Sequence, residues 1–170
     1  DFERVRQLLE EQGVIDPSRQ RRLPSQPSTI AVLTSVPSSA LADMLRTAAE
    51  RWPLTQLIVV PIPVQGAVAS KIVSTLEGLA ERSVDLGIQA LVLARGGGSR
   101  EDLAVFDDET LCRVLANYPV PVVTGLGHED DLTVADLVAD HRAATPTAAI
   151  VALLPDRDAA RQGLVQRQSR

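Results

Sequence analysis

Four predominantly apolar runs, the first of them continuous, alternate with segments of helical periodicity, and this alternation restricts the fold more than any other feature. The runs cover residues 30–33, 57–61, 88–94 and 120–126. Uninterrupted apolar sequence is typical of strands that are buried on both faces. Apolar residues recur at helical spacing in segments 38–51, 67–82, 107–117 and 131–139. We therefore expect an α/β fold with an open, doubly wound, mostly parallel sheet of the flavodoxin or Rossmann type, in strand order 2-1-3-4.

We place the α/β domain at residues 29–155, and shorter segments precede and follow it in the sequence. Residues 1–28 combine a helix that ends at Gly13 with a strap that contains three prolines. We interpret the strap's arginines (Arg19, Arg21 and Arg22) as a solvated surface, with contact to a phosphate backbone as the alternative. Residues 156–170 have the pattern of the first turns of a long polar helix. The sequence begins with Asp1 and stops within this pattern, so we interpret it as a fragment of a longer protein.

Composition excludes several classes of protein. Aromatic residues make up 2% of the chain and the formal net charge is -5, which argues against a base-stacking platform and against nucleic-acid binding by overall charge. A polyanion would need a local patch or a separate module. The single cysteine, Cys112, excludes an internal disulfide and a thiolate zinc site, and we expect it to be buried. No apolar run approaches the roughly 18 residues of a membrane span.

A glycine-rich cluster follows the third apolar run. Three consecutive glycines, Gly96, Gly97 and Gly98, permit a turn whose amides form a nest for an anion. Ser99 is placed to cap a helix whose N-terminus would face the same anion. Arg95, at the end of a buried strand, suits bidentate binding of phosphate. The alternative is a tight turn with a structural arginine–carboxylate pair. Neither a Walker A loop nor Gly-x-Gly-x-x-Gly is present, which counts against an NTPase and a dinucleotide enzyme.

A histidine-bearing cluster follows the fourth apolar run. His128 comes directly after Gly127, and histidine is well suited to proton transfer near neutral pH. Asp131 or Glu129 could orient its ring and stabilise the imidazolium. The alternatives are a histidine satisfied at a turn and an Asp130 or Asp131 that only caps the next helix. Histidine and carboxylates can also bind a divalent ion, but no spacing here demands one.

Three further candidates lie near the same sheet edge. Asp43 is on the helix after the first strand, Gln65 follows the second strand, and Arg142 follows the His128 segment. A solvated Asp43 and an Arg142 in a plain salt bridge are the alternatives. Because ligands bind at the carboxyl ends of parallel strands, we expect the glycine-rich loop, Arg95, His128 and the carboxylates to converge in one crevice.

These motifs resemble the catalytic core of the exonuclease VII large-subunit family. The segment 94–103, Ala-Arg-Gly-Gly-Gly-Ser-Arg-Glu-Asp-Leu, is similar to a family motif that has glycine in place of Ala94. The Gly127–Asp131 segment, followed by Thr133 and Asp136, is similar to a second motif. Downstream, Arg142, Thr145 and Pro146 also match the family pattern. Upstream, the strap, the first strand and residues 64–66 resemble the family as well. The chain departs at Ser38-Ser39-Ala40, where the family has Gly-Ala-Ala.

The resemblance implies an exodeoxyribonuclease that hydrolyses single-stranded DNA from both ends and releases short oligonucleotides, in bacterial DNA catabolism and repair. It implies Asp43, Arg95, His128 and Asp131 as catalytic residues. We assign phosphate binding to Gly96, Gly97, Gly98, Ser99, Gln65 and Arg142. It further implies a cytoplasmic enzyme with no required cofactor or metal, magnesium stimulation being left open. The expected partners are single-stranded DNA and a small helical subunit, which a C-terminal coiled coil recruits; an N-terminal OB-fold would complete the protein.

A function of a different class needs fewer of these residues. A non-catalytic flavodoxin-like module that binds a phosphorylated small ligand would use only the glycine-rich loop and Arg95. It would tolerate loss of His128 with little change in ligand affinity. A domain that folds correctly, but is inactive without the OB-fold and the small subunit, is the third alternative.

Overall fold

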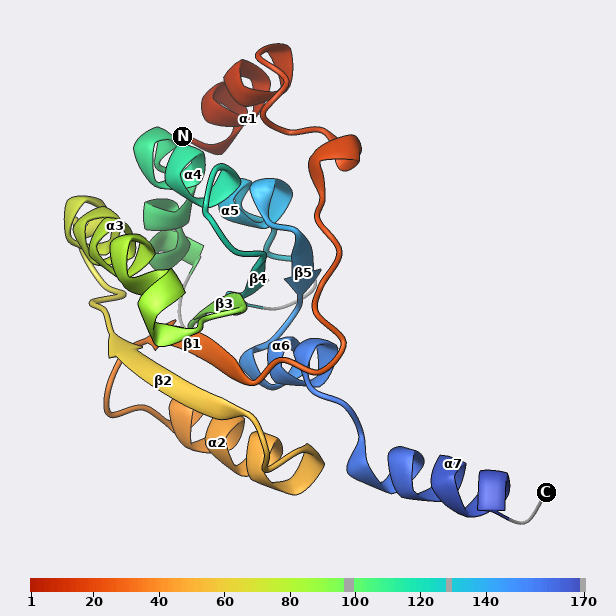
Figure 1. Ribbon diagram of the computed structural model, residues 1–170. Helices are drawn as coiled ribbons and strands as arrows, with labels where there is room; N and C mark the ends of the chain where they lie inside the picture. Colours follow the sequence, from red (N-terminus) through yellow and green to blue (C-terminus); the bar gives the residue numbers. More distant parts are fainter. Residues whose placement is uncertain (97–99, 128–129, 169–170) are drawn as a thin grey trace.

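The protein folds around a parallel five-stranded sheet in the part of the chain that the computed structural model describes, residues 1–96, 100–127 and 130–168 (Figure 1). The strand order is β2-β1-β3-β4-β5, and each neighbouring pair is parallel. The predicted fold class and the order of the first four strands are confirmed. The strands are β1 (Thr29–Thr34), β2 (Gln56–Pro61), β3 (Ala90–Ala94), β4 (Val122–Gly125) and β5 (His141–Ala143).

Helices cover both faces of the sheet (Figure 1). One face carries α1 (Phe2–Glu11), α3 (Ala69–Leu86), α4 (Glu109–Ala116) and α5 (Val134–Val138). The other carries α2 (Ser39–Arg51) and α6 (Pro146–Leu153). Short 3₁₀ helices span Pro17–Arg19 and Arg100–Asp107, and α7 (Arg157–Gln168) leads away from the body of the molecule. None of the described helices is both long and apolar enough to cross a membrane.

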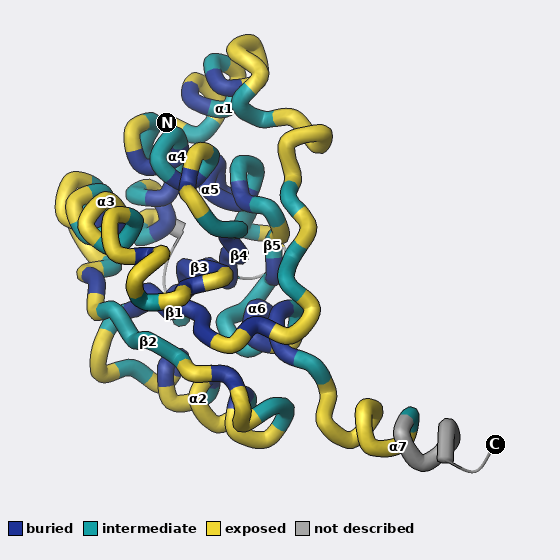
Figure 2. The backbone as a smooth tube through the Cα atoms, viewed as in Figure 1, coloured by how far each residue is buried: buried dark blue, intermediate teal, exposed yellow. Residues whose placement is uncertain are grey.

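The core is two apolar layers separated by the sheet. Alternate side chains of β1 enter different layers: Ala31 and Leu33 pack with α1, α3 and α4, whereas Ile30 and Val32 pack with α2 and α6. All six residues of β1 and all five of β3 are buried, which explains their uninterrupted apolar sequences (Figure 2). Cys112 is buried as expected, and burial raises the pKa of its thiol.

The structure differs from the sequence-based expectations at four elements. The strand β5 was not expected, because its residues His141 and Arg142 are polar and give no apolar run. The helix expected at 131–139 is shorter, and Thr133 rather than Asp130 or Asp131 caps it. Helix α3 runs to residue 86, because the left-handed Gly87 (φ 70°) ends it. On α2, the helical spacing of apolar residues in 38–51 places Leu45 on the inner face with Leu41 and Ala48, but Leu45 is 42% exposed and Met44 is buried instead.

The strap is tied to the sheet by a buried carboxylate. Asp140 accepts the backbone N–H and side-chain Nε of Arg21 on Oδ1, at 2.8 and 3.0 Å. Its Oδ2 accepts Arg21 Nη2 at 2.9 Å and the N–H of Val122 at 2.7 Å. The expectation that the strap's arginines form only a solvated surface is therefore wrong for Arg21. Arg19 also has a partner, because its Nη2 donates to Asn117 Oδ1 at 3.1 Å, whereas Arg22 is exposed.

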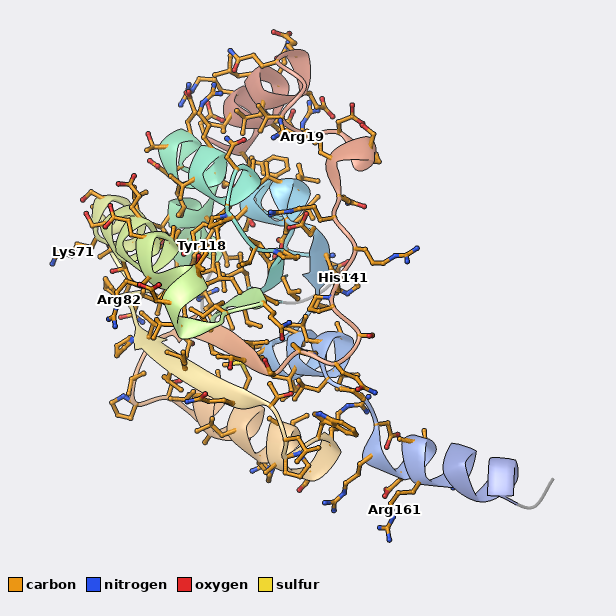
Figure 3. The ribbon with its side chains drawn as sticks, in the orientation of Figure 1. Arg19, Lys71, Arg82, Tyr118, His141 and Arg161 are labelled. Atoms are coloured by element: carbon orange, nitrogen blue, oxygen red, sulfur yellow. The ribbon has the colours of Figure 1, made fainter. Side chains whose placement is uncertain are left out.

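Tyr118 is the chain's only tyrosine, and it lies inside the molecule between α4 and α3 (Figure 3). Its hydroxyl donates a hydrogen bond of 2.7 Å to the carbonyl oxygen of Leu76. The side chain is 3% exposed, and burial raises its pKa to about 12. The ordinary tyrosine pKa is about 10. The unfolded chain therefore loses this proton at a lower pH than the folded chain does.

We predict that Tyr118→Phe changes how stability depends on pH. Below pH 10 the wild-type chain is more stable by about 1 kcal/mol, the usual net contribution of one hydrogen bond. As the pH rises from about 10 to about 12, the wild-type chain loses on the order of 1 kcal/mol per pH unit through Tyr118, and the variant does not. Urea unfolding of both chains at pH 9 and pH 11 measures this difference. A difference that stays constant with pH would contradict the assignment.

Candidate functional site

A pocket of about 240 Å³ lies where the strands β3 and β4 end, as the parallel topology requires. Four separate segments contribute to it: the start of α2, the end of β3, the residues after β4 and the start of α6. The structure thus brings Asp43, Arg95 and Gly96 together beside the His128 segment. The pocket is lined by Ser39, Ala40, Asp43, Arg95, Gly96, Gly127, Thr145, Pro146 and Thr147.

Arg95 is a buried cation that opens onto this pocket. Its backbone N–H donates to the carbonyl oxygen of Gly125 at 3.0 Å, which extends the pairing of β3 with β4. Its side chain is 5% exposed, and Nη2 lies 3.6 Å from Oδ2 of Asp102. That separation is an ion pair but exceeds hydrogen-bonding distance. Within the described residues no hydrogen bond to the guanidinium is found, so its donors are available to an anion in the pocket.

Two glycines let helix starts approach the strand ends. A Cβ on Gly125 would lie 2.7 Å from the carbonyl oxygen of Thr145 and 3.0 Å from Cα of Pro146, so only glycine lets α6 rest on the end of β4. A Cβ on Gly96 would lie 3.4 Å from Cβ of Ala40, on the first turn of α2. Sequence reasoning missed Gly125, whose only signal is a glycine at the end of a buried strand.

Asp43 lines the pocket from α2 and is paired with a cation. Its Oδ1 accepts from Arg46 Nη2 at 2.7 Å, one helical turn further on. Its side chain is 47% exposed, so water reaches the carboxylate. The carboxylate is therefore placed both to contact a bound molecule and to exchange protons with solvent.

The histidine segment is described only at its two ends. His128 and Glu129, together with Gly97, Gly98 and Ser99, lie outside the described residues. Gly127 lines the pocket, and Asp131 is half-buried beside it: a Cβ on Gly127 would lie 3.7 Å from Cβ of Asp131. The backbone positions on both sides of His128 therefore lie at or next to the pocket.

Arg142 and Gln65 are not among the residues that line the pocket. Arg142 is on β5, and its Nε lies 3.6 Å from Oδ2 of Asp136, which is the salt bridge foreseen as the alternative. Gln65 is exposed in the loop between β2 and α3. The phosphate-binding roles given to these two residues stay predictions.

Asp136 is a buried carboxylate that sequence reasoning did not assign to the site. Its Oδ1 accepts from the hydroxyl of Thr124 at 2.6 Å, and its Oδ2 accepts from the backbone N–H of Thr133 at 2.9 Å. The carboxylate thereby joins β4, the start of α5 and Arg142 on β5. The signal in the sequence is Thr-x-x-Asp, because Thr133 and Asp136 form a reciprocal capping box. These bonds fix both the end of the segment that carries His128 and the position of Arg142.

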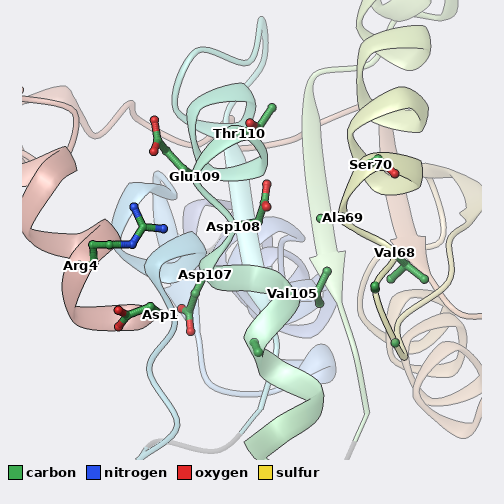
Figure 4. Close-up of a pocket in the computed structure, with 13 residues that line it drawn as sticks. Asp1, Arg4, Val68, Ala69, Ser70, Val105, Asp107, Asp108, Glu109 and Thr110 are labelled. Atoms are coloured by element: carbon green, nitrogen blue, oxygen red, sulfur yellow. The ribbon is translucent and has the colours of Figure 1, made fainter.

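A larger hollow, of about 580 Å³, lies elsewhere and contains none of the candidate residues (Figure 4). It is bordered by the starts of α1, α3 and α4. Its carboxylates support the backbone, since Asp107 Oδ1 accepts the N–H of Val134 at 2.9 Å and Asp108 Oδ2 accepts the N–H of Leu111 at 3.0 Å. Among the described residues, no group of three His, Cys, Asp or Glu side chains is arranged to hold a metal ion.

Comparison with known proteins shows which family this chain resembles. The family model described as "Exonuclease VII, large subunit" matches residues 14–170. An exodeoxyribonuclease 7 large subunit of Synechococcus sp. (strain CC9605) is 85% identical over 170 residues, which are the whole chain and 44% of that protein. The corresponding protein of Desulforudis audaxviator (strain MP104C) is 40% identical over 173 residues, covering 99% of this chain and 41% of the relative.

A third relative, the exodeoxyribonuclease 7 large subunit of Legionella pneumophila (strain Paris), is 44% identical over 155 residues, covering 91% of this chain and 34% of the relative. The chain thus spans less than half the length of these curated relatives. The match nevertheless covers every element that builds the pocket, from α2 to α6. On this evidence, the chain belongs to the exonuclease VII large-subunit family.

Proposed function

We propose that this chain is the catalytic core of a single-strand exodeoxyribonuclease, which hydrolyses phosphodiester bonds and releases short oligonucleotides. One observation supports the proposal: the buried Arg95, whose guanidinium has no hydrogen bond within the described residues, opens onto a pocket that it shares with Asp43 and with the residue before His128. A buried cation of this kind suits an anionic substrate, and the acidic groups beside it suit proton transfer. Membership of a nuclease family supports the same function.

Arg95 binds the scissile phosphate together with the loop that holds Gly96, Gly97, Gly98 and Ser99. In phosphodiester hydrolysis negative charge develops on the phosphate oxygens, and fixed donors that face this charge lower the barrier. The guanidinium is 95% buried, so water screens its charge weakly and its attraction to the phosphate is strong. Its planar fork can also hold two oxygens at once.

His128 transfers the proton in this proposal. It acts as general base on the attacking water or as general acid on the leaving oxygen, while Asp131 fixes its tautomer and stabilises the imidazolium. Asp43 is a second proton carrier or an orienting group, since its carboxylate lies in the same pocket and is open to solvent. Arg142 and Gln65 contact neighbouring phosphates of the strand.

The composition of this chain bears on the rest of the proposed enzyme. Its net charge of -5 and its 2% aromatic content suit a catalytic core better than a surface that grips a long strand. We propose that an OB-fold module holds the single-stranded DNA, and that a coiled coil continuing α7 recruits a small helical subunit in the cytoplasm. We propose further that cleavage requires no metal, while magnesium may be tested as a stimulant. The family match does not favour the non-catalytic binding module.

We predict that His128→Ala abolishes cleavage, because no other described side chain in the pocket replaces an imidazole. The measurement is digestion of end-labelled single-stranded DNA by the full-length large subunit with its small subunit, first in EDTA and then with magnesium. The matched control is His141→Ala, which changes the chain's other histidine, an exposed residue of β5. Short products in EDTA from the wild type and the control, and none from His128→Ala, are expected. Near-normal digestion by His128→Ala would refute the proposed mechanism.

We predict that Arg95→Lys lowers kcat/KM by about 100-fold, the usual effect of losing one donor to the charge that develops in a transition state. Lysine keeps the charge but presents a single ammonium in place of the planar fork. The control is Arg82→Lys, which makes the same exchange at an exposed position of α3 (Figure 3). Steady-state cleavage is measured beside thermal unfolding, so that loss of activity is separated from loss of fold. Equal kcat/KM values for both variants would remove Arg95 from the mechanism.

A further inference from the structure

Two helices begin at the pocket and direct backbone N–H groups toward it. The first amides of a helix have no partner within the helix, and the helix dipole gives this end a partial positive charge. Helix α2 starts at Ser39 and α6 at Pro146, and both starts line the pocket. The missing side chain of Gly125 lets the start of α6 lie directly on the end of β4, and Gly96 lies against Ala40 on the first turn of α2. The partial positive ends of both helices therefore face the same pocket.

The capping hydrogen bonds of α2 do not involve the first two backbone N–H groups of the helix. Ser38 caps the helix: its hydroxyl accepts the N–H of Leu41 at 3.1 Å and its carbonyl oxygen accepts that of Ala42 at 3.2 Å. Within the described residues, the N–H groups of Ser39 and Ala40 have no acceptor. Both residues line the pocket, so both amides are available there.

Helix α6 repeats this arrangement with a proline. Thr145 accepts the N–H of Ala148 on its hydroxyl at 3.2 Å and that of Ala149 on its carbonyl oxygen at 3.1 Å. Pro146 has no N–H, so the amide of Thr147 is the one that is left without an acceptor among the described residues. The hydroxyl of Thr147 lies 3.4 Å from that of Thr145 and adds a further donor at the rim.

Arg95 is an independent sign that this volume receives an anion. A guanidinium carries five N–H donors, and among the described residues this side chain, 5% exposed, has one ion pair, at 3.6 Å to Asp102. The side chain lines the pocket, so these donors are placed to reach an anion there. Among the described residues, Asp43 is the one carboxylate that lines the pocket, and Arg46 pairs with it at 2.7 Å, which offsets its repulsion of an anion.

We infer that the pocket between the starts of α2 and α6 is a subsite for a phosphate group of the DNA backbone, bound by the amides of Ser39, Ala40 and Thr147 together with Arg95. This inference rests on the proposed nuclease function for the identity of the anion. It adds a set of backbone donors, from two helices, to the glycine-rich loop. A phosphate accepts bonds on several oxygens at once, so donors from opposite sides of the pocket fix its position.

A proline at residue 39 tests the subsite without disturbing the fold. Proline is favoured at the first position of a helix, and it removes the N–H while α2 keeps its own hydrogen bonds. Ser38 already has the extended backbone (φ -157°, ψ 155°) that a residue before proline adopts. The matched control is Glu109→Pro at the first position of α4, where Asp108 is also extended (φ -66°, ψ 127°). A second variant, Thr147→Val, removes the hydroxyl alone.

The experiment uses the full-length large subunit with its small subunit, in a His128→Ala background that leaves the DNA intact. Fluorescence anisotropy measures the Kd of a labelled single-stranded octanucleotide and of a series in which one phosphate at a time is an uncharged methylphosphonate. Ser39→Pro is expected to raise the Kd of the unmodified strand about ten-fold, the effect of losing one hydrogen bond to a charged group. Thr147→Val is expected to raise it less, and Glu109→Pro not at all.

At one position of the series, the methylphosphonate should weaken binding in the parent complex and weaken it far less in Ser39→Pro, because both changes remove the same contact. If the two changes add independently at every position, or if Ser39→Pro binds like Glu109→Pro, the subsite is refuted. Cleavage by complexes that retain His128 is measured in parallel. If the effects of Ser39→Pro and of one methylphosphonate on Kd are coupled but no complex cleaves DNA, the nuclease function is refuted and the phosphate subsite is supported. If the complexes cleave DNA but the two effects are independent, the subsite is refuted and the nuclease function is supported.

Discussion

The position of Gly125 is the constraint on which the site depends. Its carbonyl oxygen accepts the N–H of Arg95, and its missing side chain lets the backbone of Thr145 and Pro146 lie directly on the end of β4. One residue therefore sets both the buried cation and the start of α6. A methyl group there would sit 2.7 Å from a backbone oxygen, which cannot rotate away as a side chain could. Helix α6 would have to move, and its amides would leave the pocket with it.

Two carboxylates with several hydrogen bonds each hold the segments about β4 together. Asp136 secures Thr124 on β4 and Thr133 at the start of α5, and Asp140 secures Arg21 and Val122. Within the part of the chain that the structure describes, the guanidinium of Arg95, in contrast, has one ion pair, at 3.6 Å, and no hydrogen bond. The carboxylates of Asp136 and Asp140 thus have acceptors that are in use, whereas Arg95 keeps donors for which the described residues offer no acceptor. Such a difference is expected where local stability is sacrificed for binding, because an anion restores the missing bonds only when it is present.

The sequence predicted those features that have a local cause. Predominantly apolar runs identified β1 to β4, and an arginine at the end of a buried strand identified Arg95. The strand β5 carries His141 and Arg142 in place of apolar residues, and its pairing with β4 is a tertiary effect that no local pattern displays. Arg21 was misread because its partner, Asp140, is 119 residues away. The contact of Gly125 with Thr145, and the convergence of two helix starts, likewise arise only when distant segments meet.

If the proposed function holds, the same architecture explains how an acidic chain accommodates a polyanion. Net charge acts at long range and is screened by salt, whereas a buried guanidinium and oriented amides act at contact distance. The backbone amides at the pocket contribute nothing to the formal charge of -5. Carboxylates border the other hollow, about the starts of α1 and α4, where they are engaged with backbone amides. For the proposed phosphate subsite between α2 and α6, recognition therefore depends on local geometry rather than on overall charge.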